Sequence, residues 1–130
     1  MGVNLNSVEI KAFVPARDFE LSKRFYQDLG FTMASDGGGI AYFHHGDHCA
    51  FLLQDFFVSE FAENLQMHLL VEDVQAWWQR IQDSGLATRY GVRLTPPVEQ
   101  PWAMIDFNLI DPCGVCWRIA QNIDRKDAQP

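Results

Sequence analysis

The sequence is poor in basic residues. It has ten lysines and arginines against seventeen aspartates and glutamates, which gives a formal net charge of −7 at pH 7. Nucleic acids and anionic membranes bind to basic surfaces. We therefore expect neither of them as a partner, and the acidic balance would favour a cationic ligand instead.

The sequence also has no long apolar run. No stretch approaches the ~18 apolar residues of a membrane-spanning helix, and residues 1–7 are too polar for a secretion signal. Cysteine is equally scarce, because three residues, an odd number, fit reduced thiols rather than a disulfide framework. Together these absences predict a cytoplasmic protein without a membrane anchor.

Aromatic residues, by contrast, are plentiful. Of the 130 residues, 48% are hydrophobic and 13% aromatic, with ten phenylalanines and four tryptophans. We expect a single domain over 1–130, because a chain of this length can bury a core without disulfides or metals. The aromatic content fits either a well-filled core or an aromatic-lined cavity or subunit interface.

Two segments of the chain share one helical pattern. Asp18 can cap a helix that runs to Leu29, where Gly30 supplies the left-handed residue that ends it. The same order recurs from Asp73 to Gly85, again twelve residues apart and at a spacing of 55. Each copy follows a predicted strand and precedes an apolar residue. The spacing therefore predicts an internal repeat.

Short stretches of alternating polarity predict the strands around these helices. The strands are expected at 8–14, 31–34, 40–44, 49–54, 66–71, 88–94, 102–110 and 115–120, tight turns at 45–48 and 111–114, and one helical turn within 56–64. This order is β-α-β-β-β twice, over approximately 7–55 and 65–121, followed by a polar tail at 122–130. It defines an α+β fold.

The first repeat also carries a family motif. PARD at 15–18, followed by RFYQDLGF at 24–31, resembles the first unit of the glyoxalase, bleomycin-resistance and extradiol-dioxygenase superfamily, also called vicinal oxygen chelate proteins. The Asp-Pro-x-Gly turn within 106–122 is similar to the last hairpin of that family, and 71–74 to the start of its second helix. The resemblance implies that the two βαβββ units form a cupped mixed sheet.

Enzymes of this family hold a divalent metal with ligands from four strands on the inner face of the cup. Counting from the capping aspartates and from the last turn identifies the corresponding residues. They are Lys11, Gln66, Arg118 and, within one residue, Phe51. Lysine and arginine are protonated donors without a lone pair, and glutamine is a poor ligand. The resemblance therefore implies that the usual metal site, and with it the catalytic residues, is missing here.

The pattern is most similar to the bleomycin-resistance branch, whose members lack the metal and dimerise by exchanging strands. Those proteins are thought to sequester a cationic drug in aromatic-lined, acidic clefts between subunits. The resemblance implies a non-catalytic homodimer that binds a small molecule such as a cationic drug or an antibiotic and uses no cofactor. The residues expected to contact the ligand are Glu9, Lys11, Phe13, Phe51, Gln66, His68, Trp102, Asp106 and Arg118.

Other interpretations remain open from the residues alone. The charged inner-face residues could pair only with one another and bind no ligand. An atypical metal site is conceivable at His68 with Glu9 or Asp106, or at His44 and His48. Such a site would make the chain a metal-dependent lyase, thiol transferase or dioxygenase. A third hypothesis is an interaction module that keeps only the fold.

Overall fold

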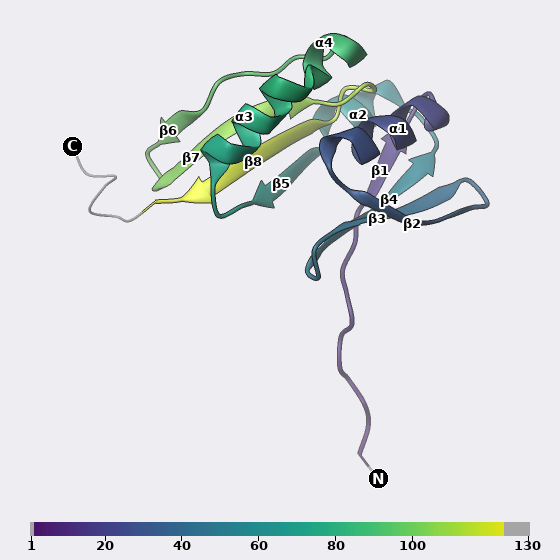
Figure 1. Ribbon diagram of the computed structural model, residues 1–130. Coiled ribbons are helices and arrows are strands. Elements are labelled where there is room, and N and C mark those ends of the chain that lie inside the picture. Colours follow the sequence, from purple (N-terminus) through teal and green to yellow (C-terminus); the bar gives the residue numbers. More distant parts are fainter. Residues whose placement is uncertain (1, 124–130) are drawn as a thin grey trace.

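The structure is a computed structural model that describes residues 2–123. Two four-stranded sheets form the fold, and helices cover one side of each sheet (Figure 1). The first unit contains β1 (Phe13–Ala16), α1 (Phe19–Leu29), β2 (Thr32–Gly37), β3 (Ile40–His45) and β4 (Cys49–Asp55). Its strand order is β1-β4-β3-β2, with β1 parallel to β4 and the other neighbours antiparallel.

The second unit repeats this arrangement after a short helix, α2 (Ser59–Asn64). It contains β5 (Gln66–Leu70), α3 (Val74–Ser84), α4 (Leu86–Tyr90), β6 (Val98–Gln100), β7 (Met104–Ile110) and β8 (Cys116–Asn122). Its strand order is β5-β8-β7-β6, with β5 parallel to β8. The predicted α+β fold and the repeated β-α-β-β-β order are confirmed.

The two long helices confirm the repeat at the level of single hydrogen bonds. Asp18 accepts a hydrogen bond of 3.1 Å from the Leu21 N–H, and Asp73 accepts one of 3.0 Å from the Ala76 N–H. Both carboxylates thus satisfy a donor that the first helical turn leaves free. Gly85 ends α3 with a φ of 68°, a conformation that favours glycine.

A buried aromatic cluster joins the two units. Tyr26 on α1 lies 4.8 Å from Phe51 on β4 and 5.5 Å from Trp117 on β8, measured between ring centroids. The Trp117 indole N–H donates to the Tyr26 hydroxyl at 2.8 Å, and that hydroxyl donates to Asp111. All four side chains are buried. Much of the aromatic content therefore fills the core, as one of the two interpretations expected.

The predicted strand at 8–14 is wrong over most of its length. The structure has β1 only from Phe13, whose register partner on β4 is Leu52. Continuing that register backwards pairs Ile10 with Cys49, the first residue of β4. Within the part of the chain that the structure describes, earlier residues have no neighbouring strand, so alternation alone does not make them a strand. They form an exposed arm, residues 2–10, which leaves the sheets on the side away from the helices (Figure 1).

Two predictions in the second unit are also wrong. The segment 88–94 is not a strand, because its first residues belong to α4. This helix follows directly on α3 and buries Leu86 completely. The strand predicted at 102–110 begins only at Met104, since 101–103 form the turn that connects β6 to β7. Ala103 lies in that turn with a φ of 62°, which extended backbone does not adopt.

The expected tail at 122–130 lies outside the described residues, apart from Asn122 at the end of β8 and Ile123. In the part of the chain that the structure describes, no helix combines the length and the apolar character needed to cross a membrane.

Candidate ligand-binding site

Each sheet has one side that the helices do not cover, which we call the open face. Phe107 on β7 packs against Trp78 on α3, with ring centroids 5.6 Å apart, so its neighbours Asp106 and Asn108 point to the opposite side. In the first sheet, Phe43 contacts Tyr26 on α1. The residues that alternate with these core residues therefore form the open faces.

Asp106 and Arg118 form an ion pair on the open face of the second sheet. The Arg118 Nη1 lies 3.3 Å from the Asp106 Oδ2. The other carboxylate oxygen, Oδ1, accepts a hydrogen bond of 2.9 Å from the side-chain amide of Gln100 on β6. Asp106 is only 3% exposed, so two cross-strand partners compensate its burial. Sequence and structure agree that Asp106 and Arg118 share this face.

His68 and Gln66 share the face with Arg118. Arg118 on β8 has two register partners. His68 on β5 lies on one side of it and Asn108 on β7 on the other. His68 and Gln66 are exposed, while Asn108 is half-buried. The register thus places His68, Arg118 and Asn108 side by side across three neighbouring strands.

Glu9 and Lys11 form a second group, on the open face of the first sheet. They lie in or next to the arm rather than on a strand, and they form an ion pair. The Tyr42 hydroxyl on β3 donates to the Glu9 Oε2 at 2.9 Å. The hydrogen bond from Lys11, followed by that from Tyr42, lowers the pKa of Glu9, and the hydrogen bond to Glu9 raises the pKa of Lys11. Both carboxylates of the predicted site are therefore already paired.

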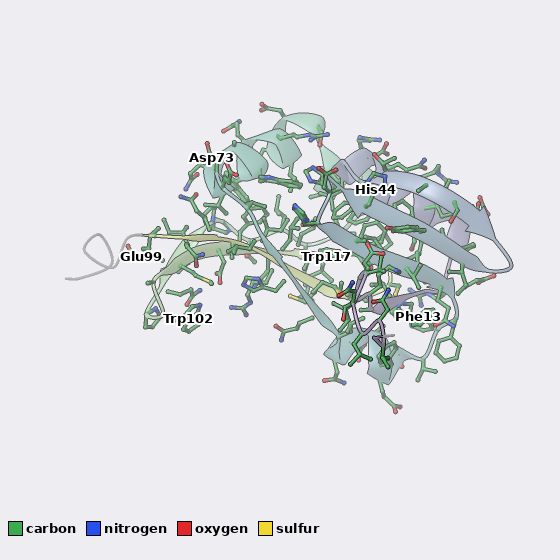
Figure 2. All side chains as sticks on the ribbon, turned by 90° about the horizontal axis from the view of Figure 1, so that it is seen from below. Phe13, His44, Asp73, Glu99, Trp102 and Trp117 are labelled. Atoms are coloured by element: carbon green, nitrogen blue, oxygen red, sulfur yellow. The ribbon has the colours of Figure 1, made fainter. Side chains whose placement is uncertain are left out.

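The three aromatic residues of the predicted site lie in different surroundings. Phe51 is 1% exposed and stacks on Phe43 at 5.4 Å, so it points into the core, and the open face of β4 carries Ala50 and Leu52 instead. Phe13 on β1 is 48% exposed. Trp102 is 56% exposed in the β6–β7 turn, at the far end of the second sheet from Phe13 (Figure 2).

A cavity of about 310 Å³ opens between the two units. Its walls include Ile10 from the arm, Ala50 and Phe51 from β4, and Met67 and His68 from β5. Two residues of the predicted site, Phe51 and His68, therefore meet at one cavity, and Ile10 brings the flanking Glu9 and Lys11 close to it. Most of this lining is apolar, so the cavity suits an apolar part of a ligand.

The open faces do not present a ligand set that fits a divalent metal. Arg118 and Lys11, which the resemblance aligns with metal-ligand positions, form ion pairs with Asp106 and Glu9. Within residues 2–123, no group of three or more histidine, cysteine, aspartate or glutamate side chains is placed to hold a metal ion. His44 and His45, adjacent on β3, have different neighbours: His44 lies near Tyr42, and the His45 ring packs 5.0 Å from that of Trp77.

Three residues of the open faces escaped the sequence analysis. Tyr42 belongs to a predicted strand, and the alternation of side chains along that strand could have placed it on the face opposite to that of its neighbour Phe43. Asn108 lies in a predicted strand two residues after Asp106, but nothing in the sequence marked it as a neighbour of Arg118. Gln100 lies in a strand that was not predicted, after two prolines, and no sequence signal connects it with Asp106.

Comparison with known proteins identifies the family. The model of the Glyoxalase/Bleomycin resistance protein/Dioxygenase superfamily matches residues 5–119, and the chain belongs to this superfamily. Over 115 residues it is 28% identical to a bleomycin resistance protein of Klebsiella pneumoniae, which covers 84% of this chain and 88% of that protein.

Solved structures show the same fold. A bleomycin-binding protein complexed with bleomycin superimposes with a TM-score of 0.75 at 24% identity, over 89% of this chain and 99% of the other. The bleomycin-binding protein from bleomycin-producing Streptomyces verticillus, complexed with copper(II)-bleomycin, gives a TM-score of 0.73 at 20% identity, over 93% and 99% of the two chains. These solved structures show the fold that this chain shares with bleomycin-binding proteins.

Proposed function

We propose that the protein binds a small antibiotic-type molecule against its open faces and releases it chemically unchanged. The observation that carries this proposal is the pair of uncovered sheet faces, which hold polar side chains and meet an apolar cavity of about 310 Å³. Similarity to proteins named for bleomycin binding and resistance supports the same class of ligand.

The chemistry of the open faces supports binding without catalysis. A general base or a metal ligand needs a free lone pair, and Asp106 and Glu9 both have cationic partners. Cys113, the most buried cysteine, is no better as a nucleophile, because burial raises its pKa to about 12. The paired carboxylates and the buried thiol are therefore not poised to transform a ligand.

Calorimetry with a panel of antibiotics that includes bleomycin tests this function. We expect a saturable heat with a Kd in the micromolar range, about −8 kcal/mol, and recovery of the unchanged antibiotic by mass spectrometry. The half-exposed Trp102 should stack on the ligand, so Trp102→Ala should weaken binding roughly tenfold, whereas Phe61→Ala, which removes an exposed ring from α2, should not. A panel without any ligand below about 1 mM, or a chemically altered antibiotic, would contradict the proposal.

We further propose that the protein is a homodimer held together by the arm, residues 2–10. Val8 and Ile10 are 99% and 95% exposed, and they alternate as in a strand. Burying such a side chain is worth about 1.5–3 kcal/mol, and the arm pairs with no strand among residues 2–123. A second copy, which offers the same sheet edges, is the occupant that fits.

Sedimentation equilibrium checks the dimer. Ile10→Asp places a charge on the apolar side of the arm and is expected to shift the protein from dimer to monomer, because an unpaired buried charge opposes association. Ser7→Asp adds the same charge on the other side of the arm and should leave the dimer intact. A wild-type protein that sediments as a monomer at 100 times the concentration used in the binding assay would refute the dimer.

A further inference from the structure

The charged groups on the open face of the second sheet point to a particular kind of ligand. The negative charge on this face is enclosed, since Asp106 is 3% exposed and both of its carboxylate oxygens accept hydrogen bonds. The accessible groups include two that can donate hydrogen bonds: the Arg118 side chain is 29% exposed, and His68 is exposed beside it. A ligand approaching this face therefore meets a guanidinium and an imidazole rather than a carboxylate.

Arg118 has unused hydrogen-bonding capacity. A guanidinium has five N–H donors, and the single contact of Arg118 with Asp106, at 3.3 Å, is longer than the 2.7–2.9 Å usual for a charge-assisted bond. Among residues 2–123, the Arg118 Nε–H has no acceptor although it is buried. Leaving such groups unpaired is unfavourable. One long contact also leaves the guanidinium free to turn toward an incoming acceptor.

We propose that the row His68–Arg118–Asn108 binds an acidic group of the ligand, such as a carboxylate, sulfonate or phosphate. Two oxygens of such a group match the planar fork of a guanidinium, which a cationic ligand cannot use. The amide N–H groups of Asn108 and an imidazole N–H of His68 lie on either side of Arg118 and can donate to the same group.

The adjoining cavity determines the rest of the ligand. His68 belongs both to the row and to the cavity of about 310 Å³. A molecule whose acidic group lies on Arg118 can therefore place its apolar body against Ile10, Ala50 and Met67 in the cavity wall. The ligand class that fits is an acid with an apolar or aromatic body. This inference rests on the proposed function, and it reverses the charge that the acidic composition of the chain favours for the ligand.

Two probes with the same ring and opposite charge test the inference: naphthalene-2-sulfonate and 2-naphthylmethylammonium, titrated into the full chain by calorimetry. The sulfonate is expected to bind at least about tenfold more tightly, as one charge-assisted hydrogen bond allows. Arg118→Gln should abolish that preference, and Arg118→Lys should restore part of it, because lysine keeps the charge without the fork. Arg24→Gln, which removes an exposed charge from α1, is the matched control and should change nothing.

Equal binding of the two probes, a preference for the ammonium, or no binding of either below about 1 mM would overturn the inference. An Arg118→Gln protein that folds like the wild type and keeps the preference for the sulfonate would also overturn it. Bleomycin titrated into the same samples separates the two proposals. If the protein binds bleomycin but shows no preference for the sulfonate, only the acidic-group site is refuted. If it binds the sulfonate through Arg118 but binds no antibiotic of the panel, only the antibiotic-binding function is refuted.

Discussion

Replacing Asp111 with alanine is expected to lower the free energy of unfolding by roughly 3 kcal/mol or more. The Asp111 carboxylate is 3% exposed, and its Oδ1 accepts hydrogen bonds of 2.9 Å from the backbone N–H of both Cys113 and Val115. Its Oδ2 accepts from the Tyr26 hydroxyl. Alanine leaves three buried donors without an acceptor, at about 1–3 kcal/mol for each.

Urea unfolding of Asp111→Ala beside two comparison variants measures this loss. Asp47→Ala removes an exposed carboxylate from the β3–β4 turn and should change stability by less than about 0.5 kcal/mol. Asp111→Asn keeps one acceptor oxygen and should fall between the two. Equal urea midpoints for Asp111→Ala and Asp47→Ala would contradict the prediction. They would mean that the hydrogen bonds of Asp111 do not stabilise the packing of the turn at 111–114 against α1.

The pH dependence of stability gives a second readout for Asp111. Burial raises the pKa of its carboxyl in the folded protein, against the opposing effect of the hydrogen bonds from Tyr26 and the backbone. The folded state then holds the proton more tightly than the unfolded chain does. The stability from this group is therefore full below its unfolded pKa and is lost as the pH rises through the folded pKa. In Asp111→Asn this part of the pH profile should disappear.

Replacing Phe51 with alanine is expected to lower the free energy of unfolding by about 3–5 kcal/mol. The ring is 1% exposed and contacts Tyr26, Phe43 and Trp117 with centroids 4.8, 5.4 and 5.2 Å away. It therefore links the core of the first unit to β8 of the second. Truncation removes these contacts and leaves a cavity that the surrounding sheet and helix cannot close.

Thermal and urea unfolding of Phe51→Ala, Phe51→Leu and Trp102→Ala decide this prediction. Leucine fills most of the space and should cost less than alanine. Trp102 is 56% exposed, so its truncation should affect ligand binding far more than stability. Equal stability losses for Phe51→Ala and Trp102→Ala would mean that Phe51 belongs to the ligand face, as the sequence analysis expected, and not to the core.

Local signals in the sequence were sufficient for the fold. A capping aspartate and a terminal glycine act within one turn of a helix, so Asp18 and Asp73 locate α1 and α3 without reference to the rest of the chain. Their repetition gave the two β-α-β-β-β units. Strands were harder to predict, because a strand exists only where a neighbour pairs with it. Residues 8 and 9 continue the alternation of the predicted strand but run beyond the first residue of β4, whereas β6 alternates poorly and still pairs with β7.

The candidate site depended more heavily on tertiary structure. Strand parity correctly placed His68, Asp106 and Arg118 on one face of the second sheet. The uncertainty of one residue at Phe51 matters because neighbouring residues in a strand point to opposite faces. The Phe51 ring packs in the core and reaches the ligand site only as part of the cavity wall. Gln100 and Tyr42 became partners of Asp106 and Glu9 through contacts between distant segments, which no local pattern encodes.

By itself, then, the sequence determined the fold class, the two helices with their caps, and the chemistry of the side chains available to the open faces. The family resemblance implied that Lys11 and Arg118 occupy positions where an enzyme of the family would hold a metal. Only the tertiary structure decided which charges remain accessible. Asp106 is enclosed by Gln100 and Arg118 because three strands bring them together. The charged group that stays accessible there is the Arg118 guanidinium, although the chain has a net charge of −7.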